Sequence, residues 1–450
     1  MRNQLRLLRD VSTFILMAGT WRLWFAASDF PAIPFFEFLT AVPRIVDRVL
    51  SSVLIAALLV DTFLTTIRCV RGCTSVRSVR IGQLCDLLFI TMAVGLALLN
   101  QHCLQPWMYH FLLLTPLLWL SRPNSRLIVK NADVAATVES GMREAFSRNA
   151  ILWLTSSIYF WSACSKLDAS FLQSHGPKFV EVICDAVGIS TRFWTELTWQ
   201  IAAATLPVGE LLVGVLLLFR RTQSFGLLAS LLMHALLIVA VGPWGLNHRA
   251  GVLLWNGFFV VQNIILFRAA RDVATAGATT DLPGSAFQTV LTAGRASSGP
   301  WYRLSVAFLV GAILFPVTHS IGCGDTWPAW AVYASSPARV LVQVQDDSVE
   351  QLPESLMPYI EPRPFNDGWS WLRIDLWSLA ATGTPIYPED RFQLGVARFV
   401  AEAAESGNGI RIIHEEEADR WTGKRERKEF QGHAEMSRLA AKFHLNTTPH

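Results

Sequence analysis

The sequence predicts an all-α, multi-pass membrane helix bundle of about nine spans over residues 1–320, followed by a small α+β domain over residues 321–450. Three observations carry this prediction. The composition is 52% hydrophobic and 16% charged, which is too apolar for an ordinary soluble enzyme. Apolar runs of near-spanning length recur through the first region. The residues after Cys323 are richer in Pro, Asp and Glu and alternate apolar with polar side chains.

The apolar runs give the expected spans in chain order. The first run follows a basic amino end and is also compatible with a signal peptide, so both interpretations stay open. The stretch DFPAIPFFEFL, residues 29–39, is short and interrupted by proline, so we expect it at the membrane surface or as a re-entrant piece. The expected spans are residues 10–27, 49–67, 83–100, 105–120, 149–165, 198–219, 223–242, 250–267 and 302–320.

Basic residues between the runs orient the bundle. If residue 1 is cytoplasmic, the connections that carry Arg68, Arg71, Arg220 and Arg221 are inside, and the outer connections hold fewer basic residues. The positive-inside rule therefore predicts a cytoplasmic amino end. It also places Lys166 and the carboxy-terminal domain on the extracytoplasmic side of an integral membrane protein whose spans contact lipid.

The carboxy-terminal region has the patterning of a compact domain. Alternation in RVLVQVQ (339–345) and in WLRIDLW (371–377) predicts strands. RFQLGVARFVAEAAE (391–405) and AEMSRLAAKF (434–443) have helical spacing. A region of about 130 residues is long enough to bury a core of its own.

The residue types exclude several function classes. A formal net charge of +3 with scattered basic residues does not predict nucleic-acid binding. The sequence has no His/Cys cluster at zinc spacing, no Walker loop, no GxGxxG after a strand and no GxSxG elbow, so we expect no metal and no nucleotide. Cys103, Cys164, Cys184 and Cys323 lie near the expected outer side, where disulfides can form, but spacing does not select a pairing.

Several polar side chains are expected at membrane depth, where an unpaired polar group is costly. They are Asp61, Glu210, His234, Asn256 and Asn263. One interpretation is that they pair with each other and hold helices together. The other is that some of them line a pocket. The candidate pocket residues are Glu210, His234 and Asn256 and, from the mouth loop GPWGLNHRAG, Asn247 and His248.

The segment YFWSACSKLDASFL, residues 159–172, resembles the part of vitamin K-dependent γ-carboxylases, and of the broader HTTM group of membrane proteins, in which an aromatic-rich helix ends in Lys-Leu-Asp. Lys166 and the two residues after it match this run. The segment MYHFLLLTPLLWLSRPNSR is similar to a family segment in which a histidine precedes an apolar helix. His110 matches that histidine, whereas Tyr109 stands where the carboxylases have asparagine. GPWGLNHRAGVLLWN and PAWAVYASSPARVLVQV are similar to later landmarks of bacterial members.

This resemblance implies a quinol-dependent enzyme, either a carboxylase of the lyase type or an epoxidising relative. In the carboxylases a deprotonated lysine starts the oxygenation of reduced vitamin K, the oxygenated ring removes a proton from glutamate, and carbon dioxide adds. By resemblance, Lys166 is the catalytic base and His110 hydrogen-bonds to the quinol oxygen. The implied cofactor is a reduced quinone that enters from lipid, and a protein or peptide is the implied substrate. Apolar neighbours such as Trp161, a further expected pocket residue, disfavour the ammonium form by desolvation.

Two other functions and one structural role stay open. The Gly-Glu-Leu-Leu helix around Glu210 resembles that of redox-accessory membrane proteins of the DoxX or MauE sort. A non-catalytic scaffold whose outer domain binds a partner is the third hypothesis. A lysine just beyond a span also commonly extends to the lipid headgroups, with a neighbouring tryptophan as an interfacial anchor.

Overall fold

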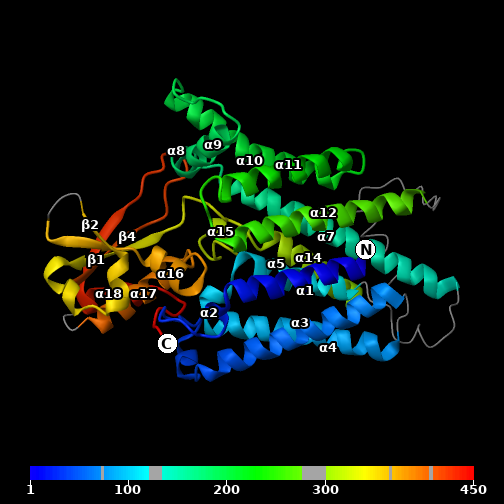
Figure 1. Cartoon of the computed structure of the whole chain (residues 1–450), viewed down its shortest axis with the longest axis horizontal. Helices are drawn as coiled ribbons and strands as arrows, with labels where there is room; N and C mark the ends of the chain where they lie inside the picture. Colours follow the sequence, from blue (N-terminus) through cyan, green and yellow to red (C-terminus); the bar gives the residue numbers. More distant parts are fainter. Residues whose placement is uncertain (72–74, 121–133, 276–299, 364–366, 405–408) are drawn as a thin grey trace.

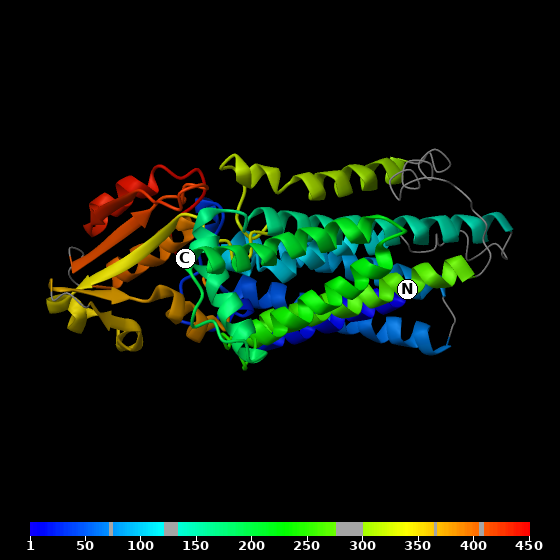
Figure 2. The same cartoon turned by 90° about the horizontal axis from the view of Figure 1, so that it is seen from above.

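The computed structural model describes residues 1–71, 75–120, 134–275, 300–363, 367–404 and 409–450. It is mostly helical, with a bundle of long helices and a sheet region at one end of that bundle (Figure 1). The amino end lies toward the opposite end of the bundle, as both views show (Figures 1 and 2). The sheet region and the first residue are thus separated along the long axis of the molecule.

The bundle is built from the helices that precede the sheet region in the described part of the chain. They are α1 (Arg2–Gly19), α2 (Trp21–Trp24), η1 (Glu37–Ala41), α3 (Ile45–Arg71), α4 (Val76–Leu99), η2 (Gln101–Cys103), α5 (Pro106–Leu120), α7 (Val134–Cys164), α8 (Ala169–Gln173), α9 (His175–Ala186), α10 (Glu196–Leu218), α11 (Gln223–Val241), α12 (Ala250–Thr275), α14 (Pro300–Leu314) and α15 (Val317–Ser320). Side-chain caps fix some of the starts. Ser75 accepts from the Ser78 amide at 3.1 Å before α4, and Thr195 accepts from the Thr198 amide at 3.3 Å before α10.

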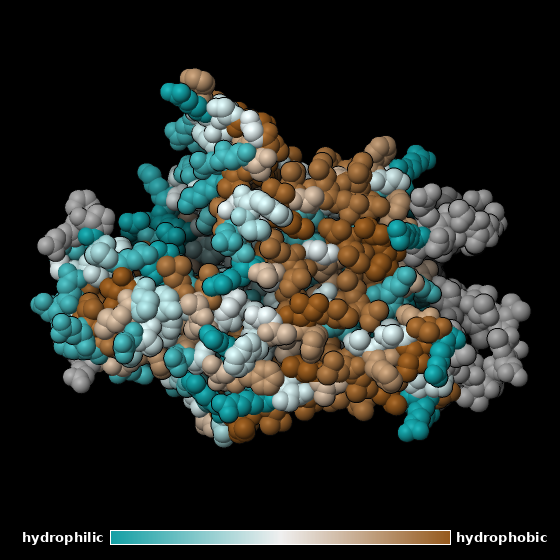
Figure 3. Space-filling view, viewed as in Figure 1, coloured by the Kyte–Doolittle hydropathy of each residue, from teal (hydrophilic) through white to brown (hydrophobic). Residues whose placement is uncertain are grey.

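Six of the described helical segments are long and apolar enough to cross a membrane. They are Ile45–Arg71, Val76–Leu99, Glu196–Leu218, Gln223–Val241, Ala250–Arg268 and Arg303–Ser320. Six of the expected spans therefore coincide with helices of membrane-spanning length and composition. The expected spans 105–120 and 149–165 fall on α5 and α7, which are helical but outside this group. The expected span 10–27 is not one continuous helix, because α1 ends at Gly19 and α2 covers only Trp21–Trp24. Figure 3 shows the hydrophobic surface gathered over the bundle and the hydrophilic surface over the sheet region and the bundle ends.

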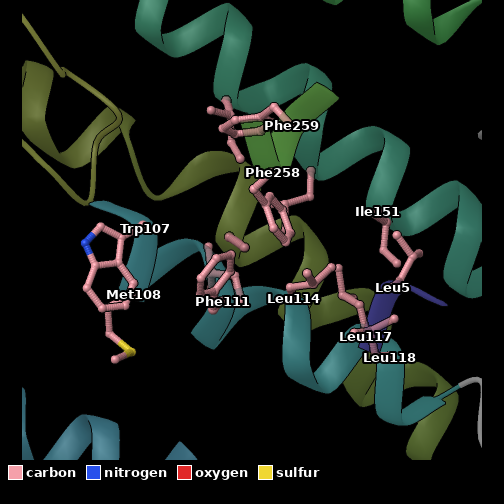
Figure 4. Packing of buried hydrophobic residues seen from close by; sticks show 14 of the residues in the cluster. Leu5, Trp107, Met108, Phe111, Leu114, Leu117, Leu118, Ile151, Phe258 and Phe259 are labelled. Carbon is pink, nitrogen blue, oxygen red and sulfur yellow. The ribbon is translucent and has the colours of Figure 1, made fainter. Parts of the chain in front are cut away.

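The bundle core is built where α1, α5, α7 and α12 meet (Figure 4). Leu5, Phe111, Ile151 and Phe258 are each at most 2% exposed and belong to one continuous cluster. Their side chains come from four different helices, so burial of this apolar surface holds distant parts of the chain together. The first predicted segment is therefore an integral part of the packed bundle.

A buried charge cluster joins α1 to its neighbours. Arg6 Nη2 donates to Asp61 Oδ2 at 2.7 Å and to Asp86 Oδ1 at 2.6 Å. Arg9 Nε donates to Asp10 Oδ1 at 2.8 Å, and these five side chains are at most 1% exposed. The basic amino end was expected on the cytoplasmic side of the membrane, and the structure buries Arg6 and Arg9 of this end against the carboxylates of α3 and α4. Three helices are thereby tied at fixed positions.

The carboxy-terminal region contains a five-stranded antiparallel sheet in the order β2-β3-β1-β4-β5. The strands are β1 (Arg339–Gln345), β2 (Ile360–Pro362), β3 (Trp369–Leu372), β4 (Ile410–Glu415) and β5 (Arg427–Gln431). The remaining elements are η3 (Asp346–Gln351), η4 (Glu354–Tyr359), α16 (Ile374–Thr382), α17 (Asp390–Ala403) and α18 (Gly432–Ala440). The predicted strand 339–345 and the predicted helices near 391–405 and 434–443 are confirmed.

The predicted strand over 371–377 is only partly present. Strand β3 ends at Leu372, and α16 begins at Ile374. Ile374, Trp377 and Ser378 are buried, which is the i, i+3, i+4 spacing of one helix face. Apolar residues in 371–377 fit the alternation of a strand at first and the three- or four-residue spacing of a helix afterwards. The prediction of one strand over this run was therefore wrong beyond Leu372.

The core of the carboxy-terminal region includes two residues from the amino-terminal third of the chain. Phe30 and Ile33 are 5% and 0% exposed and pack into the cluster that contains Val342 and Phe392. The Phe35 amide donates to Leu98 O at 2.9 Å, which holds this stretch beside the end of α4. The segment 29–39 thus links the bundle to the sheet region.

An ionic junction fastens α17 to the end of α4. Arg391 Nη1 donates to Asp325 Oδ1 at 2.9 Å and its Nε donates to Gln101 Oε1 at 3.0 Å. Glu389 lies 3.6 Å from the same guanidinium and accepts from the Thr326 amide at 2.7 Å. Burial, reinforced by the carboxylate of Asp325, raises the pKa of Glu389 to about 7.

Replacing Glu389 with glutamine is expected to remove a pH dependence of stability. The folded chain holds a proton on this carboxyl that the unfolded chain releases near its ordinary pKa. The stabilising contribution is therefore complete at low pH and decreases by about 2–3 kcal/mol as pH rises toward 7. Thermal unfolding of the full chain between pH 5 and 8 measures this decrease. The exposed Glu402 provides the matched control as Glu402→Gln. An unchanged pH dependence in Glu389→Gln contradicts the assignment.

Candidate functional site

Lys166 lies in the turn between α7 and α8, at the end of the bundle next to the sheet region. Asp168, the last residue of the Lys-Leu-Asp run, caps α8 by accepting from the Phe171 amide at 2.7 Å. The Ala169 amide donates to Arg420 O at 2.9 Å, and the Arg420 guanidinium donates to Leu167 O at 3.3 Å. A loop of the carboxy-terminal region therefore closes over the turn that carries Lys166.

The amine of Lys166 is paired with the carboxylate of Glu210. Lys166 Nζ lies 2.7 Å from Glu210 Oε2 on α10 and 2.6 Å from Ser162 Oγ one turn earlier on α7. Both charged side chains are 13% exposed. The pair is therefore mostly enclosed and does not extend freely into solvent or headgroups. The expected catalytic residue and an expected pocket residue are brought together here.

A second, more deeply buried polar network joins α7, α11 and α12. Tyr159 Oη is 2.8 Å from His234 Nε2, and His234 Nδ1 is 2.9 Å from Asn256 Oδ1. Asn263 Nδ2 donates to Tyr159 Oη at 3.0 Å. The Glu210 carboxylate is within electrostatic range of both Tyr159 and His234. The hydrogen bonds described here do not join this network to the Lys166–Glu210 pair.

His110 occupies an aromatic box at the start of α5. Its ring stacks on Phe259 with centroids 4.9 Å apart, and Phe259 also stacks on His234 with centroids 5.2 Å apart. Trp255 Nε1 donates to His110 Nδ1 at 3.4 Å. One phenylalanine ring therefore contacts both histidines, although the hydrogen bonds described here do not join His110 directly to Lys166.

The other three expected pocket residues lie apart from this arrangement. Trp161 Nε1 donates to Ile313 O at 2.8 Å and connects α7 to α14. His248 Nδ1 is 2.9 Å from Tyr333 Oη at the end of α11. Asn247 is exposed in the turn after α11, with φ of 50°. These three residues contact other helices or lie in the turn after α11, and none of them is bonded to Lys166 in the contacts described here.

Two cavities lie where the bundle meets the carboxy-terminal region. The larger, of about 420 Å³, is lined by Trp21, Arg22, Asp29, Tyr359 and Trp377 among others. The smaller, of about 20 Å³, includes His102 and Cys103 in its lining. Lys166 lines neither. Among the residues that the structure describes, no group of three or more His, Cys, Asp or Glu side chains has the arrangement of a metal site, and all six described cysteines are free.

Several residues of the site were not identified from sequence. Ser162 is one helical turn before Lys166, and this i, i+4 spacing was the available signal. Tyr159 stood within the quoted aromatic run but was not assigned a role. Trp330 belongs to the segment after the last span and contacts the His110 ring, with centroids 6.0 Å apart. Only the fold brings it there, because nothing local in the sequence around Trp330 indicates that contact.

The arrangement can exchange protons. A primary amine and a carboxylate 2.7 Å apart can share one proton, and the interior of a helix bundle reduces the screening of their charges. The neighbouring phenol and imidazole are also hydrogen-bonding groups that can donate or accept. Comparison of the chain with models of protein families, with curated proteins and with solved structures found no match.

Proposed function

We propose that this chain is a nine-span membrane enzyme of the HTTM type that uses Lys166 as a general base toward a lipid-soluble quinol. The observation that carries the proposal is the mostly enclosed ion pair between Lys166 and Glu210. In this proposal the amino end is cytoplasmic and the carboxy-terminal region is extracytoplasmic. Dioxygen is the proposed oxidant of the bound quinol. A protein or peptide is the proposed substrate that loses a proton and gains carbon dioxide in the carboxylation, whereas in an epoxidising enzyme the quinol alone is the substrate.

Glu210 can accept the proton of the Lys166 ammonium group and so convert Lys166 into a base. In the ion pair the amine carries the proton, and a shift of that proton by one hydrogen bond to Glu210 leaves a neutral amine. Such a transfer separates no charge, so it is less costly in a poorly solvated site than release of the proton to bulk water. The neutral Lys166 Nζ can then accept a proton from a substrate hydroxyl.

The surroundings fit a substrate that arrives from lipid. Lys166 is at the end of α7, and Glu210 is on α10, one of the six helices that are long and apolar enough to cross a membrane. Ser162 holds the amine toward the helices at 2.6 Å. A lipophilic ring that reached this pair from the membrane would approach it between these two helices.

Replacing Lys166 with arginine or glutamine is expected to abolish turnover. Arginine keeps the charge pair with Glu210 but does not release its proton, so it separates loss of the base from loss of structure. We expect the dioxygen-dependent oxidation of 2-methyl-1,4-naphthoquinol, catalysed by the full chain in lipid nanodiscs, to fall at least about 100-fold in both variants. The exposed Lys178, as Lys178→Gln, is the matched control.

The outcome also distinguishes the alternatives. Quinol oxidation that stays within about threefold of the unmodified chain in both Lys166 variants contradicts the proposed base. Loss of activity on replacing Cys103, Cys164, Cys184 or Cys323, with Lys166 variants active, instead favours the redox-accessory function. Rescue by the carboxy-terminal region on an unrelated span favours the scaffold.

A further inference from the structure

The larger cavity lies where the break between α1 and α2 meets the carboxy-terminal region. α16 packs against α2, and the residue that ends α16, Gly383, is left-handed with φ of 79°. A Cβ built on Gly383 would lie 3.3 Å from the carbonyl oxygen of Gly19, so this end of α16 sits directly on the end of α1. The cavity of about 420 Å³ is lined by segment 21–29 of the bundle and by η4 and α16 of the carboxy-terminal region. Its volume is sufficient for a small polar molecule or a lipid headgroup.

Two opposite charges line this cavity without pairing. Arg22 and Asp29 both belong to the lining, and both side chains are exposed. Within the described part of the chain, neither of them forms an ion pair. The Arg22 guanidinium carbon lies 5.9 Å from the centre of the Trp21 ring, which also lines the cavity. Both charges are therefore available to a ligand that carries one negative and one positive group.

The hydroxyl groups of the lining indicate which cation fits. Ser28, Ser355 and Tyr359 line the cavity together with Asp29, so four side chains there carry oxygen atoms that accept hydrogen bonds. A primary ammonium has three N–H donors for such a set, as the lysine side chain has. A quaternary ammonium has no N–H group and leaves these oxygens unused. The lining thus favours a primary amine.

The donors of the lining indicate which anion fits. Trp377 is 3% exposed and lines the cavity, and its indole N–H has no acceptor among the residues that the structure describes. Buried N–H groups are nearly always paired, so this donor indicates a missing acceptor. The guanidinium of Arg22 lines the same cavity, and guanidinium groups match the geometry of phosphate oxygens. A phosphate diester can accept from both donors.

The position of the cavity favours a lipid as the source of these groups. Arg48 Nε donates to Phe25 O at 3.3 Å, which joins segment 21–29 to the start of α3, one of the helices long and apolar enough to cross a membrane. Ile45 and Val49 at this start of α3 are 58% and 52% exposed. Apolar surface for acyl chains therefore begins next to the segment that lines the cavity. Trp21, which is 50% exposed, fits an interfacial tryptophan at the same level.

We propose that this cavity binds the headgroup of a phospholipid with a primary amine, namely a phosphoethanolamine lipid. Arg22 and Trp377 bind its phosphate, and Asp29 with the neighbouring hydroxyl groups binds its ammonium. The acyl chains lie along the apolar surface of the bundle. The bound headgroup contacts both segment 21–29 and α16, so it connects the bundle to the carboxy-terminal region. The site contains neither Lys166 nor Glu210, so it is independent of the proposed base.

The test measures binding of dioleoyl phosphatidylethanolamine and dioleoyl phosphatidylcholine to the full chain by native mass spectrometry from detergent micelles. These lipids differ only in the methyl groups that replace the N–H donors of the amine. We expect the unmodified chain to bind the ethanolamine lipid at least about fivefold more tightly. Asp29→Asn is expected to remove this preference. Arg22→Gln is expected to weaken binding of both lipids about fivefold, because both carry the phosphate.

Two matched variants and a soluble probe keep the outcomes distinct. Asp347→Asn and Arg192→Gln change exposed charges outside the two described cavities and are expected to leave both affinities unchanged. Glycerophosphoethanolamine has the headgroup without acyl chains, and we expect it to bind at least about tenfold more weakly than the lipid. Equal binding of this soluble probe overturns the lipid as the source. Equal affinity of the unmodified chain for the two lipids, or an unchanged preference in Asp29→Asn, overturns the site.

Discussion

Replacing Arg6 with leucine is expected to destabilise the bundle by about 3–5 kcal/mol, because removal of one partner leaves buried charges uncompensated. Arg6 Nη2 is the donor to both Asp61 and Asp86, at 2.7 and 2.6 Å, and all three side chains are at most 1% exposed. The expected result is a large decrease in the apparent melting temperature of the full chain in detergent micelles, or the absence of folded protein.

A double variant makes this prediction specific. In the cluster of Arg6, Arg9, Asp10, Asp61 and Asp86, Arg6→Leu removes one of two guanidinium groups that face three carboxylates. Arg6→Leu with Asp86→Leu restores the original difference of one charge, so it is expected to be more stable than Arg6→Leu alone. The exposed Arg192, as Arg192→Leu, should change stability little. Equal stability of Arg6→Leu and Arg192→Leu contradicts a structural role for the cluster.

The sequence predicted the long apolar helices well because hydropathy over a spanning window is a local property. It did not reveal that the charged residues of α1 form buried ion pairs with other helices. Arg6, Arg9 and Thr13 lie at helical spacing on one face, but a basic amino end has the same composition when its charges remain at the membrane surface. The partners Asp61 and Asp86 are more than fifty residues away, and only the packing of α1 against α3 and α4 identifies them.

For the candidate site, as for α1, the sequence indicated single residues but not most of the contacts between them. Lys166 and Glu210 were each selected as single residues, but their pairing joins positions 44 residues apart on different helices. His234 and Asn256 were selected because polar groups at membrane depth need partners, and they are indeed hydrogen-bonded to each other. Trp330 follows the last expected span, where neither periodicity nor charge distinguishes it from an interfacial tryptophan.

The carboxy-terminal region is a third case in which the sequence predicted local elements but not the distant residues that pack against them. Composition changes near Cys323, and the strand and helix patterns after it predicted most of its elements. Phe30 and Ile33 nevertheless complete its core, because proline-rich segment 29–39 follows the first helix to the same end of the bundle. A short apolar stretch with proline indicates that it does not span, but it does not indicate which surface it covers.

Replacing Arg391 with leucine is expected to cost about 3–5 kcal/mol and to release the carboxy-terminal region from the bundle. Arg391 is buried, and its guanidinium bonds to Asp325 and to Gln101, so the variant leaves the buried Gln101 amide oxygen and the mostly enclosed Asp325 carboxylate, 14% exposed, without this donor. Hydrogen exchange of α17 and of η2 measures the loss. Both elements are expected to lose protection together, because the same side chain connects them.

Arg373 supplies the matched control for this prediction. It also pairs with two acidic groups, Glu361 at 3.0 Å and Asp375 at 2.8 Å, but its side chain is 39% exposed. Water screens these pairs, so Arg373→Leu is expected to cost only about 0–1 kcal/mol. The two arginines thus make comparable bonds in different surroundings. If both variants lose the same stability, burial is not what gives the Arg391 junction its strength. Other contacts between the bundle and α17, such as the ring contacts of Phe30 and His102 with Phe392, then have to supply the link.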